Sequence, residues 1–477
     1  MTEANDRGLG AWRGGLSSAD VEHIHEQSLH LLSTVGFRLT DPEAQALTRK
    51  AGASVDEVEG RVRLPPELVA WALDQSPHKI TRYALDGKPY VLQPGALYHC
   101  TGTHRTKVLD YGAEKPRRAT CRDLERMVRV SEALPRVISV SPAVTPADVH
   151  DGPVELRELE ILFHNTGKHL YNSPASPQEA RWTLDLAELM SNDPLSEKPT
   201  ITIRVNPTTP LVLADEVAQV TIVSARRGAI LALGSACAAG TTSPMTLAGT
   251  VLMQNVEFLF QLVLAQLARP GAPSDYQVAS TIADLRTGMH MYGAVEMTLL
   301  TAGLKAMAER YGLPFSANQS TDAPLIDAGN GMEKMLHLGY KMAIGVNFLR
   351  NAGDLDKAST MSCEQLVIDH EIGLALERFW TGIRVDEDTL AVEVIREVGP
   401  GGAFLNHSHT LEHCRTGEHY VPPFLYRAGT GKPSLVDWAN ERVERMLQSH
   451  RFHLEDAKAG KLERYLSEER QEAKAAR

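Results

Sequence analysis

Thr200-Ile-Thr-Ile-Arg-Val-Asn206 and Gly228-Ala-Ile-Leu-Ala-Leu-Gly-Ser235 are short runs of mostly β-branched and aliphatic residues, and each predicts a strand buried on both faces. The amphipathic segment between them predicts a helix. Thr209-Pro210 favours its start, because proline is tolerated at the first helical position. Arg226-Arg227-Gly228 favours its end, with cations in the last turn and glycine just beyond. Strands joined by such a crossover helix pair in parallel.

The same alternation of buried run and amphipathic segment repeats along the chain. Ser176-Pro-Gln-Glu179 and Ser243-Pro244 predict helix starts, and Tyr311-Gly312 predicts a helix end. Eight units come close to the roughly 250 residues of a (β/α)8 TIM barrel, the fold class that we predict. A doubly wound open sheet is the alternative, although no GxGxxG follows the first strand. The predicted strands lie within residues 96–102, 137–143, 168–173, 200–206, 228–235, 275–281, 314–318 and 343–349.

The pattern divides the chain into three parts. Residues 1–95 predict an extension with helices and a β-hairpin, since Asp86-Gly87 and Pro94-Gly95 are turn dipeptides between β-prone runs. Residues 96–381 predict the barrel. Residues 382–477 predict a second extension that ends in a charge-rich helical segment from residue 442 onward, either a surface helix or an oligomer arm.

Composition narrows the partners. The 477 residues carry a net charge of −11, which disfavours nucleic acid and anionic membrane surfaces. The longest apolar run, residues 258–268, is interrupted by Gln261 and Gln266, so no membrane span is expected. The amino-terminal sequence lacks an apolar leader, and the five cysteines form no CxxC pair. We therefore expect a cytoplasmic protein.

In a barrel of this kind the reacting groups sit at the carboxyl ends of the strands. The residues there are polar and mostly uncharged, with no GxSxG elbow, P-loop or obvious pair of facing carboxylates. They include Tyr98, Thr101, Thr145, Tyr171, Asn172, Arg204, Asn206, Ser235, Cys237, residues 280–286, residues 318–322 and residues 347–351.

Two other patterns keep different chemistry open. His407-Ser-His409, with His413, Cys414 and the distant Cys237, could seed a metal site in a barrel hydrolase or lyase, or it could cap a loop. Cys237 itself lies among small residues, which favours close packing over a nucleophile. The pair His23 and His25 points to different helix faces. We assign no metal site from these patterns.

One further set of motifs runs along most of the chain. It includes Ser280-Thr-Ile-Ala-Asp-Leu-Arg-Thr-Gly288, residues 98–110, which we interpret as a hairpin, and residues 311–314, 320–334, 361–372, 398–405 and 409–410. In this order the motifs resemble the trimethylamine methyltransferase family, in its branch without pyrrolysine. The resemblance implies a barrel enzyme that moves a methyl group from a methylated amine to the cobalt of a corrinoid. The cobalamin would come on a separate carrier protein, because this chain lacks the DxHxxG signature of such carriers and is expected to bind no cofactor tightly.

The resemblance also implies a substrate site. The pyrrolysine of trimethylamine-using members falls near Gln319 or Ser320, where ordinary residues stand, and this favours a quaternary amine such as glycine betaine. An aromatic cage and carboxylates would hold the ammonium. An arginine, namely Arg286, Arg204 or Arg350, would hold a betaine carboxylate. The expected catalytic residues are Gln319, Ser320 and Asp322, and the expected substrate-binding residues are Tyr98, Tyr171, Arg286, Tyr292, Phe315, Glu371 and His409.

Two other hypotheses about the function remain open. A metal-dependent hydrolase or lyase would use His407, His409 and Cys237, and a non-catalytic betaine-binding protein would keep the barrel without turnover. We also expect the chain to assemble as a homo-oligomer, whose number of subunits the sequence leaves open.

Overall fold

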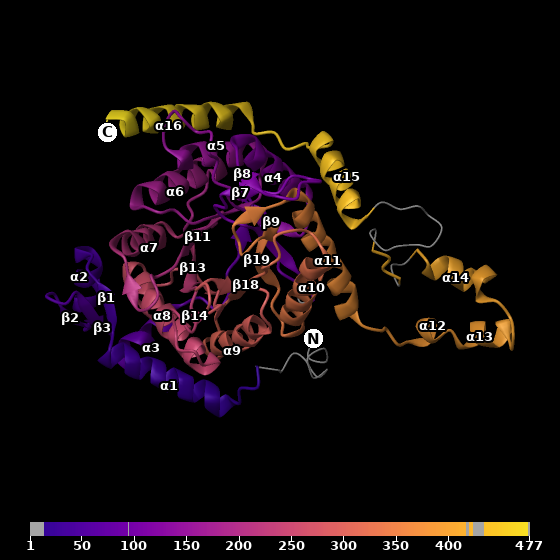
Figure 1. Cartoon of the computed structure of the whole chain (residues 1–477), viewed down its shortest axis with the longest axis horizontal. Helices are drawn as coiled ribbons and strands as arrows, with labels where there is room; N and C mark the ends of the chain where they lie inside the picture. Colours follow the sequence, from indigo (N-terminus) through magenta and orange to yellow (C-terminus); the bar gives the residue numbers. More distant parts are fainter. Residues whose placement is uncertain (1–13, 94, 416–418, 423–433, 476–477) are drawn as a thin grey trace.

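A closed barrel of eight parallel strands forms the centre of the molecule (Figure 1). The computed structural model describes residues 14–93, 95–415, 419–422 and 434–475. Each predicted run contains or overlaps one barrel strand, so the predicted fold class is confirmed. In chain order the strands are β6 (Tyr98–Thr101), β9 (Val137–Val140), β10 (His169–Asn172), β11 (Ile201–Val205), β13 (Ile230–Ser235), β15 (Ser274–Val278), β18 (Phe315–Asn318) and β19 (Phe348–Ala352).

A helix follows each barrel strand and covers the outside of the barrel. Ser176 caps the helix that starts at Pro177, as predicted, and Gly228 and Gly312 end their helices with positive φ angles of 84° and 65°. The predicted starts at Pro210 and Pro244 are wrong, because both prolines lie in the preceding loops. The helices are α4 (Cys121–Ala133), α5 (Val154–Asn165), α6 (Pro177–Ser191), α7 (Asp215–Arg227), α8 (Leu247–Ala268), α9 (Val295–Tyr311), α10 (Ala328–Ala343) and α11 (Cys363–Thr381).

Two strand predictions need correction. The last strand begins at Phe348 rather than at Ala343, because Ala343 ends α10 and Gly345, with φ of 82°, turns the chain before the strand. Residues 98–110 form no hairpin. Tyr98–Thr101 is the first barrel strand, whereas β7 (Lys107–Val108) pairs with β8 (Arg117–Arg118) and β21 (Thr360–Met361) in a small sheet beside the barrel.

The described residues before the barrel pack on one side of it and cover its amino end. The helices α1 (Ser18–Thr34), α2 (Pro42–Lys50) and α3 (Pro66–Gln75) surround a small sheet of β1 (Phe37–Leu39), β2 (Ser54–Asp56), β3 (Arg61–Arg63) and β12 (Val212–Leu213). The expected hairpin at Asp86-Gly87 forms as β4 (Arg82–Tyr83) and β5 (Pro89–Tyr90). Its amides bond Pro199 and Gly167, which precede barrel strands, so the hairpin closes the amino end.

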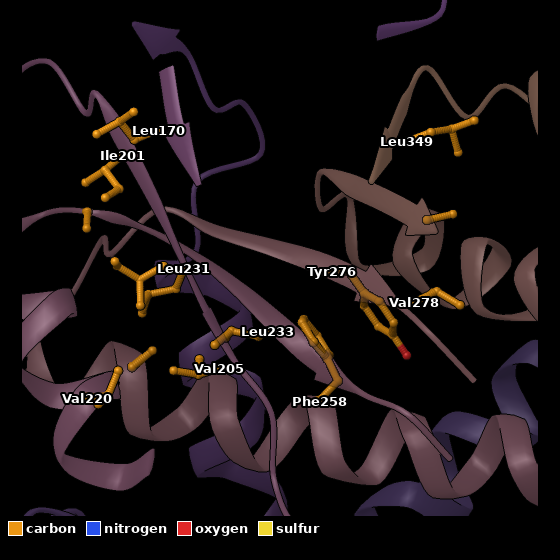
Figure 2. Close-up of a cluster of buried hydrophobic side chains, with 14 of the residues drawn as sticks. Leu170, Ile201, Val205, Val220, Leu231, Leu233, Phe258, Tyr276, Val278 and Leu349 are labelled. Atoms are coloured by element: carbon orange, nitrogen blue, oxygen red, sulfur yellow. The ribbon is translucent and has the colours of Figure 1, made fainter. Parts of the chain in front are cut away.

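The helix α8 joins the barrel to this amino-terminal layer. It contacts α1, α3 and α7, and Phe258 stacks on Tyr276 of β15 with ring centroids 3.8 Å apart (Figure 2). Among the described helices it alone is long and apolar enough to cross a membrane, and 72% of its most apolar window is buried. Packing in the core accounts for its apolar residues.

The carboxyl-terminal residues leave the barrel and return to it. The short helices α12 (Glu387–Leu390), α13 (Val392–Val398) and α14 (Ser408–His413) lie in a segment that stands off the barrel (Figure 1). We call residues 382–415 the arm. The charge-rich terminal segment is two helices rather than one: α15 (Leu435–Gln448) packs on α11 and α4, and α16 (Asp456–Ala475) packs on α5 and α6.

Candidate functional site

Four polar side chains point into the barrel near the carboxyl ends of its strands. Successive residues of a strand alternate in direction, and Tyr276 faces α8, so the next residue, Gln277, faces the lumen. The hydroxyl of Tyr171 donates to Oε1 of Gln277 at 3.0 Å. Arg204 of β11 is close enough to Tyr171 and Arg350 for their charges to affect its pKa. Tyr171 thus lies in the lumen, as expected.

Arg204 and Arg350 are the unusual members of this group. Arg350 is 1% exposed, donates from Nη2 to the carbonyl of Val278 at 2.7 Å and has no partner for Nε. Arg204 is partly exposed, and Asn206 accepts from its Nη2 at 2.7 Å when that amide is oriented to suit its neighbours. No carboxylate in the described ranges forms an ion pair with either guanidinium. Burial lowers the pKa of Arg204, and the charges of Arg350 and Arg105 lower it further.

A third arginine at the same end is fully paired. Arg105 donates from Nε and Nη2 to the two carboxylate oxygens of Asp354, at 3.0 and 2.8 Å. Asp354 also accepts from Ser320 Oγ at 2.9 Å, and Asn351 donates to that same Ser320 oxygen at 3.0 Å. Ser320 therefore lies near the barrel mouth, as expected, but inside a network that is already satisfied. Arg204 and Arg350, by contrast, have no carboxylate partner in the described ranges.

Asp322 positions the loop that carries Tyr292. Its carboxylate accepts from the backbone N–H groups of Tyr292 and Gly293, at 2.8 and 3.0 Å. Burial raises the pKa of Asp322, and the nearby Glu333 carboxylate adds to this. Tyr292 is partly exposed and lies close enough to Arg204 and Arg105 for their charges to affect its pKa. Asp322 therefore holds the backbone of Tyr292 in place, and the Tyr292 side chain lines the mouth.

His104, Glu155 and Glu158 form a largely buried cluster behind the mouth that was not predicted from the sequence. His104 Nε2 bonds Asn172 Oδ1 at 3.1 Å, and its Nδ1 lies 3.5 Å from Glu158 Oε2. Burial raises the pKa of Glu155, helped by the Glu158 charge. Burial alone would lower the pKa of His104, but the bond to Glu158 and the charges of Glu158 and Glu155 outweigh it and raise that pKa. The spacing Glu155-x-x-Glu158 after a strand was the one available signal.

Three expected site residues lie elsewhere in the barrel wall. Tyr98 is at the amino end, where its hydroxyl donates to the Val91 carbonyl at 3.3 Å in the segment that closes that end. Phe315 starts β18 and packs outward, 6.1 Å from the Tyr276 ring. Gln319 bonds Nδ1 of His99 at 3.0 Å, and the His99 ring faces Gly373 of α11, so Gln319 lies between the barrel and α11.

Three more lie outside the barrel wall. Arg286 is exposed in a turn that Asp284 caps. Glu371 lies on α11, where its carboxylate contacts His370 and Tyr420. His409 lies on α14 in the arm. The structure therefore brings Tyr171, Tyr292, Ser320 and Asp322 to the mouth and leaves the other six candidates away from it.

The alternative metal site of a hydrolase does not assemble. Cys237 is buried beside Ser235 and Glu257, at 3.2 and 3.5 Å, and burial raises the pKa of its thiol. His407 and His409 lie on the arm, well away from the strand that precedes Cys237 (Figure 1). A thiol with a raised pKa in a small-residue environment is a packing residue rather than a nucleophile.

Comparison with known proteins places these features in a family. The family model for trimethylamine methyltransferase (MTTB) matches residues 14–474. The chain is 30% identical to a glycine betaine methyltransferase of Desulfitobacterium hafniense over 91% of this chain and 90% of that protein. It is 31% identical to the trimethylamine methyltransferase MttB of Methanosarcina barkeri, over 92% and 91%.

A second Desulfitobacterium hafniense relative, a trimethylamine methyltransferase MttB, is 30% identical over 84% of this chain and 82% of its own length. The solved structure of the Methanosarcina barkeri monomethylamine methyltransferase covers 91% of this chain and 93% of its own, with a TM-score of 0.46 and 11% identity. The match to the family model and the identity to these relatives extend over nearly the whole chain. The chain belongs to the trimethylamine methyltransferase family.

Proposed function

We propose that the chain demethylates a quaternary ammonium carboxylate, a betaine, and passes the methyl group to the cobalt of a corrinoid on a separate carrier protein. We choose a betaine as the substrate because Arg204 and Arg350 have no carboxylate partner among the described residues. A buried unpaired cation is costly, and a ligand carboxylate would remove that cost. The guanidinium fork matches a carboxylate in a bidentate arrangement.

The charge of the mouth separates a betaine from other methylated amines. A bare cation such as choline or protonated trimethylamine would be repelled by two uncompensated guanidinium groups. A betaine is neutral overall, so its carboxylate would pair with Arg204 while its ammonium packs on an aromatic face. Tyr171 and Tyr292 are the rings close enough to Arg204 to serve, and such a contact contributes about 0.5–2 kcal/mol.

This chain's residues bind and orient the substrate, and they need not move a proton. The nitrogen of a quaternary ammonium leaves as a neutral tertiary amine when the N–CH3 bond breaks, so no general acid is required. The reduced cobalt of the bound corrinoid supplies the nucleophile. The work of Arg204, Tyr171 and Tyr292 is alignment and exclusion of water, and such orientation effects reach roughly 7–11 kcal/mol.

The open end of the barrel suits a visiting cofactor. The amino end is covered by the β4–β5 hairpin, and at the carboxyl end Arg204 and Tyr292 keep partial exposure. A carrier would therefore approach from the carboxyl end. The residues at the position of the family's pyrrolysine also fit a quaternary substrate, since neither Gln319 nor Ser320 is an electrophile that could engage a neutral amine.

The remaining partners follow from the surface. We infer a homo-oligomer, because the arm exposes apolar side chains such as Ile383, Val385 and Leu405, which are 79%, 71% and 83% exposed. We also infer a cytoplasmic location, which suits free cysteines and a corrinoid that must stay reduced.

Demethylation of matched amines tests the proposal. The protein is mixed with reduced cobalamin, or with a corrinoid carrier, and with glycine betaine, longer betaines, choline or trimethylamine. Formation of methylcobalamin is followed by absorbance. We expect turnover of a betaine and little of choline. Preference for choline or trimethylamine would contradict the substrate, and methyl transfer from none of the amines would favour a non-catalytic betaine-binding protein.

A further inference from the structure

The arm is held together by polar contacts on its surface, such as Arg384–Asp388 and His407–Glu397, and its helices have no buried core. Its helices α12, α13 and α14 contain no buried residue, and Figure 1 shows them apart from the barrel. The subunit contact proposed above is one source of stability for such a segment, and a structural metal, which small folded segments commonly use, is another. The arm nevertheless places three metal-ligating side chains together.

These three side chains are Asp388 of α12 and His409 and His413 of α14. One ligand atom from each lies within 4.8 Å of the other two. His409 and His413 are four residues apart, so they share one helix face, and their ring centroids are 4.1 Å apart. His413 Nε2 lies 3.5 Å from Asp388 Oδ1. The cluster thus joins α12 to α14 across the arm.

The cluster already has polar partners. Asp388 Oδ2 accepts from Arg384 Nη2 at 3.0 Å, and His409 Nε2 lies 3.4 Å from the Asp388 carbonyl. A cation would bind the other Asp388 oxygen, Oδ1, and would take the place of the long contact of His409. Two imidazole nitrogens and one carboxylate oxygen, with water in the fourth position, make a tetrahedral set that zinc accepts.

We propose that Asp388, His409 and His413 bind a zinc ion that staples α12 to α14 and orders the arm. The site is not the His407-Ser-His409 pair that the sequence suggested. His407 Nδ1 accepts from the His409 backbone N–H, and its Nε2 bonds Glu397 at 3.1 Å, so His407 is occupied elsewhere. The chelating pair is instead the two histidines separated by four positions.

Zinc binding to the full-length protein tests this. Zinc chloride is titrated in competition with a chromophoric chelator, against His409→Ala, His413→Ala and Asp388→Asn. We expect one tight site per wild-type chain and at least about a hundredfold weaker binding in each variant, because even outer-shell changes at zinc sites cost 10- to 100-fold. His453→Ala is the control, since His453 is an 82% exposed histidine outside the arm. It should bind zinc like the wild type.

Limited trypsin digestion gives an independent measurement. Arg384 and Arg396 lie on the arm with 61% and 72% exposed side chains, and the exposed Arg451 lies outside it. Zinc should slow cleavage at Arg396 at least several-fold in the wild type, leave cleavage at Arg451 unchanged, and protect none of the three variants. Absence of tight zinc binding, binding by all three variants equal to that of the wild type, or no protection of the arm would overturn the proposal. None of these results depends on methyl transfer.

Discussion

The two ends of the barrel treat their buried arginines differently. At the amino end Arg82 pairs with Asp275 at 3.2 Å, with side chains only 5% and 1% exposed, and its guanidinium lies 4.3 Å from the Phe348 ring centroid. At the carboxyl end Arg204 and Arg350 have no such partner in the described chain. At the closed end Asp275 balances the charge of Arg82, although Arg82 Nε has no partner there, whereas no carboxylate of the described residues balances Arg204 or Arg350 and a ligand carboxylate could.

The largest expected effect comes from breaking the paired end. Arg82→Met leaves Asp275 buried without its cation, and we expect it to lower the free energy of unfolding by about 3–5 kcal/mol. Denaturant unfolding of the full chain measures this. The double variant Arg82→Met with Asp275→Leu should recover most of the loss, because no lone charge stays buried. A loss below about 1 kcal/mol in the single variant would contradict the importance of the pair.

Replacing Arg204, which has no carboxylate partner, should lower activity rather than stability. Arg204→Met loses no ion pair and removes an unpaired cation, so its free energy of unfolding should equal or exceed that of the wild type. Its kcat/KM for the betaine should fall roughly 30- to 160-fold, mainly through a higher KM. This corresponds to a loss of about 2–3 kcal/mol of binding free energy. Arg204→Lys keeps the charge and should recover part of the loss. Full activity of Arg204→Met would remove Arg204 from the site.

A smaller effect is expected from a substitution in the loop that carries Tyr292. A Cβ at Gly293 would lie 2.5–2.8 Å from the carboxyl group of Glu333. That carboxylate also accepts from the Asp322 amide at 2.8 Å, so it cannot move without breaking this bond. Gly293→Ala should displace Tyr292 and cost about 1–2 kcal/mol in kcat/KM, with little change in stability. Gly331→Ala is the control, because a Cβ there meets no atom within 4 Å.

The smallest effect concerns pH at the cluster behind the mouth. The folded protein raises the pKa of His104 above its unfolded value of 6.5, so the His104–Glu158 pair contributes its full stability below pH 6.5. That contribution is lost as the pH rises through the raised value. The stability advantage of the wild type over His104→Gln should therefore shrink between pH 6 and pH 10, by about 1 kcal/mol. A constant difference would mean that His104 is neutral in the folded protein.

The barrel could be predicted from the sequence. The direction in which individual side chains point, into the barrel or away from it, could not. Alternating buried runs and amphipathic helices locate seven of the eight barrel strands, because burial on both faces leaves a continuous apolar signal, whereas the eighth run overlaps β19 only at Phe348 and Leu349. Strand ends are uncertain by a few residues, and one residue reverses the direction of a side chain. Gln319 and Ser320 show this: the first faces α11 and the second faces the mouth.

The misplaced candidates have physical reasons of their own. Tyr98 and Phe315 are aromatic residues at the starts of strands, and sequence alone does not show which end of a short run a ring will reach. Asp322 does lie at the mouth, but its oxygens accept from backbone N–H groups and are not free for a substrate. The cluster of His104, Glu155 and Glu158 depends on a contact between distant segments, and its local signal is limited to the spacing Glu155-x-x-Glu158.

A crystal structure with the most rapidly demethylated betaine bound would test the central claim most directly. The account predicts the ligand at the carboxyl end of the barrel, its carboxylate within hydrogen-bond distance of the Arg204 guanidinium and its ammonium against Tyr171 or Tyr292. A betaine whose carboxylate avoids both Arg204 and Arg350, or one bound outside the barrel mouth, would contradict it.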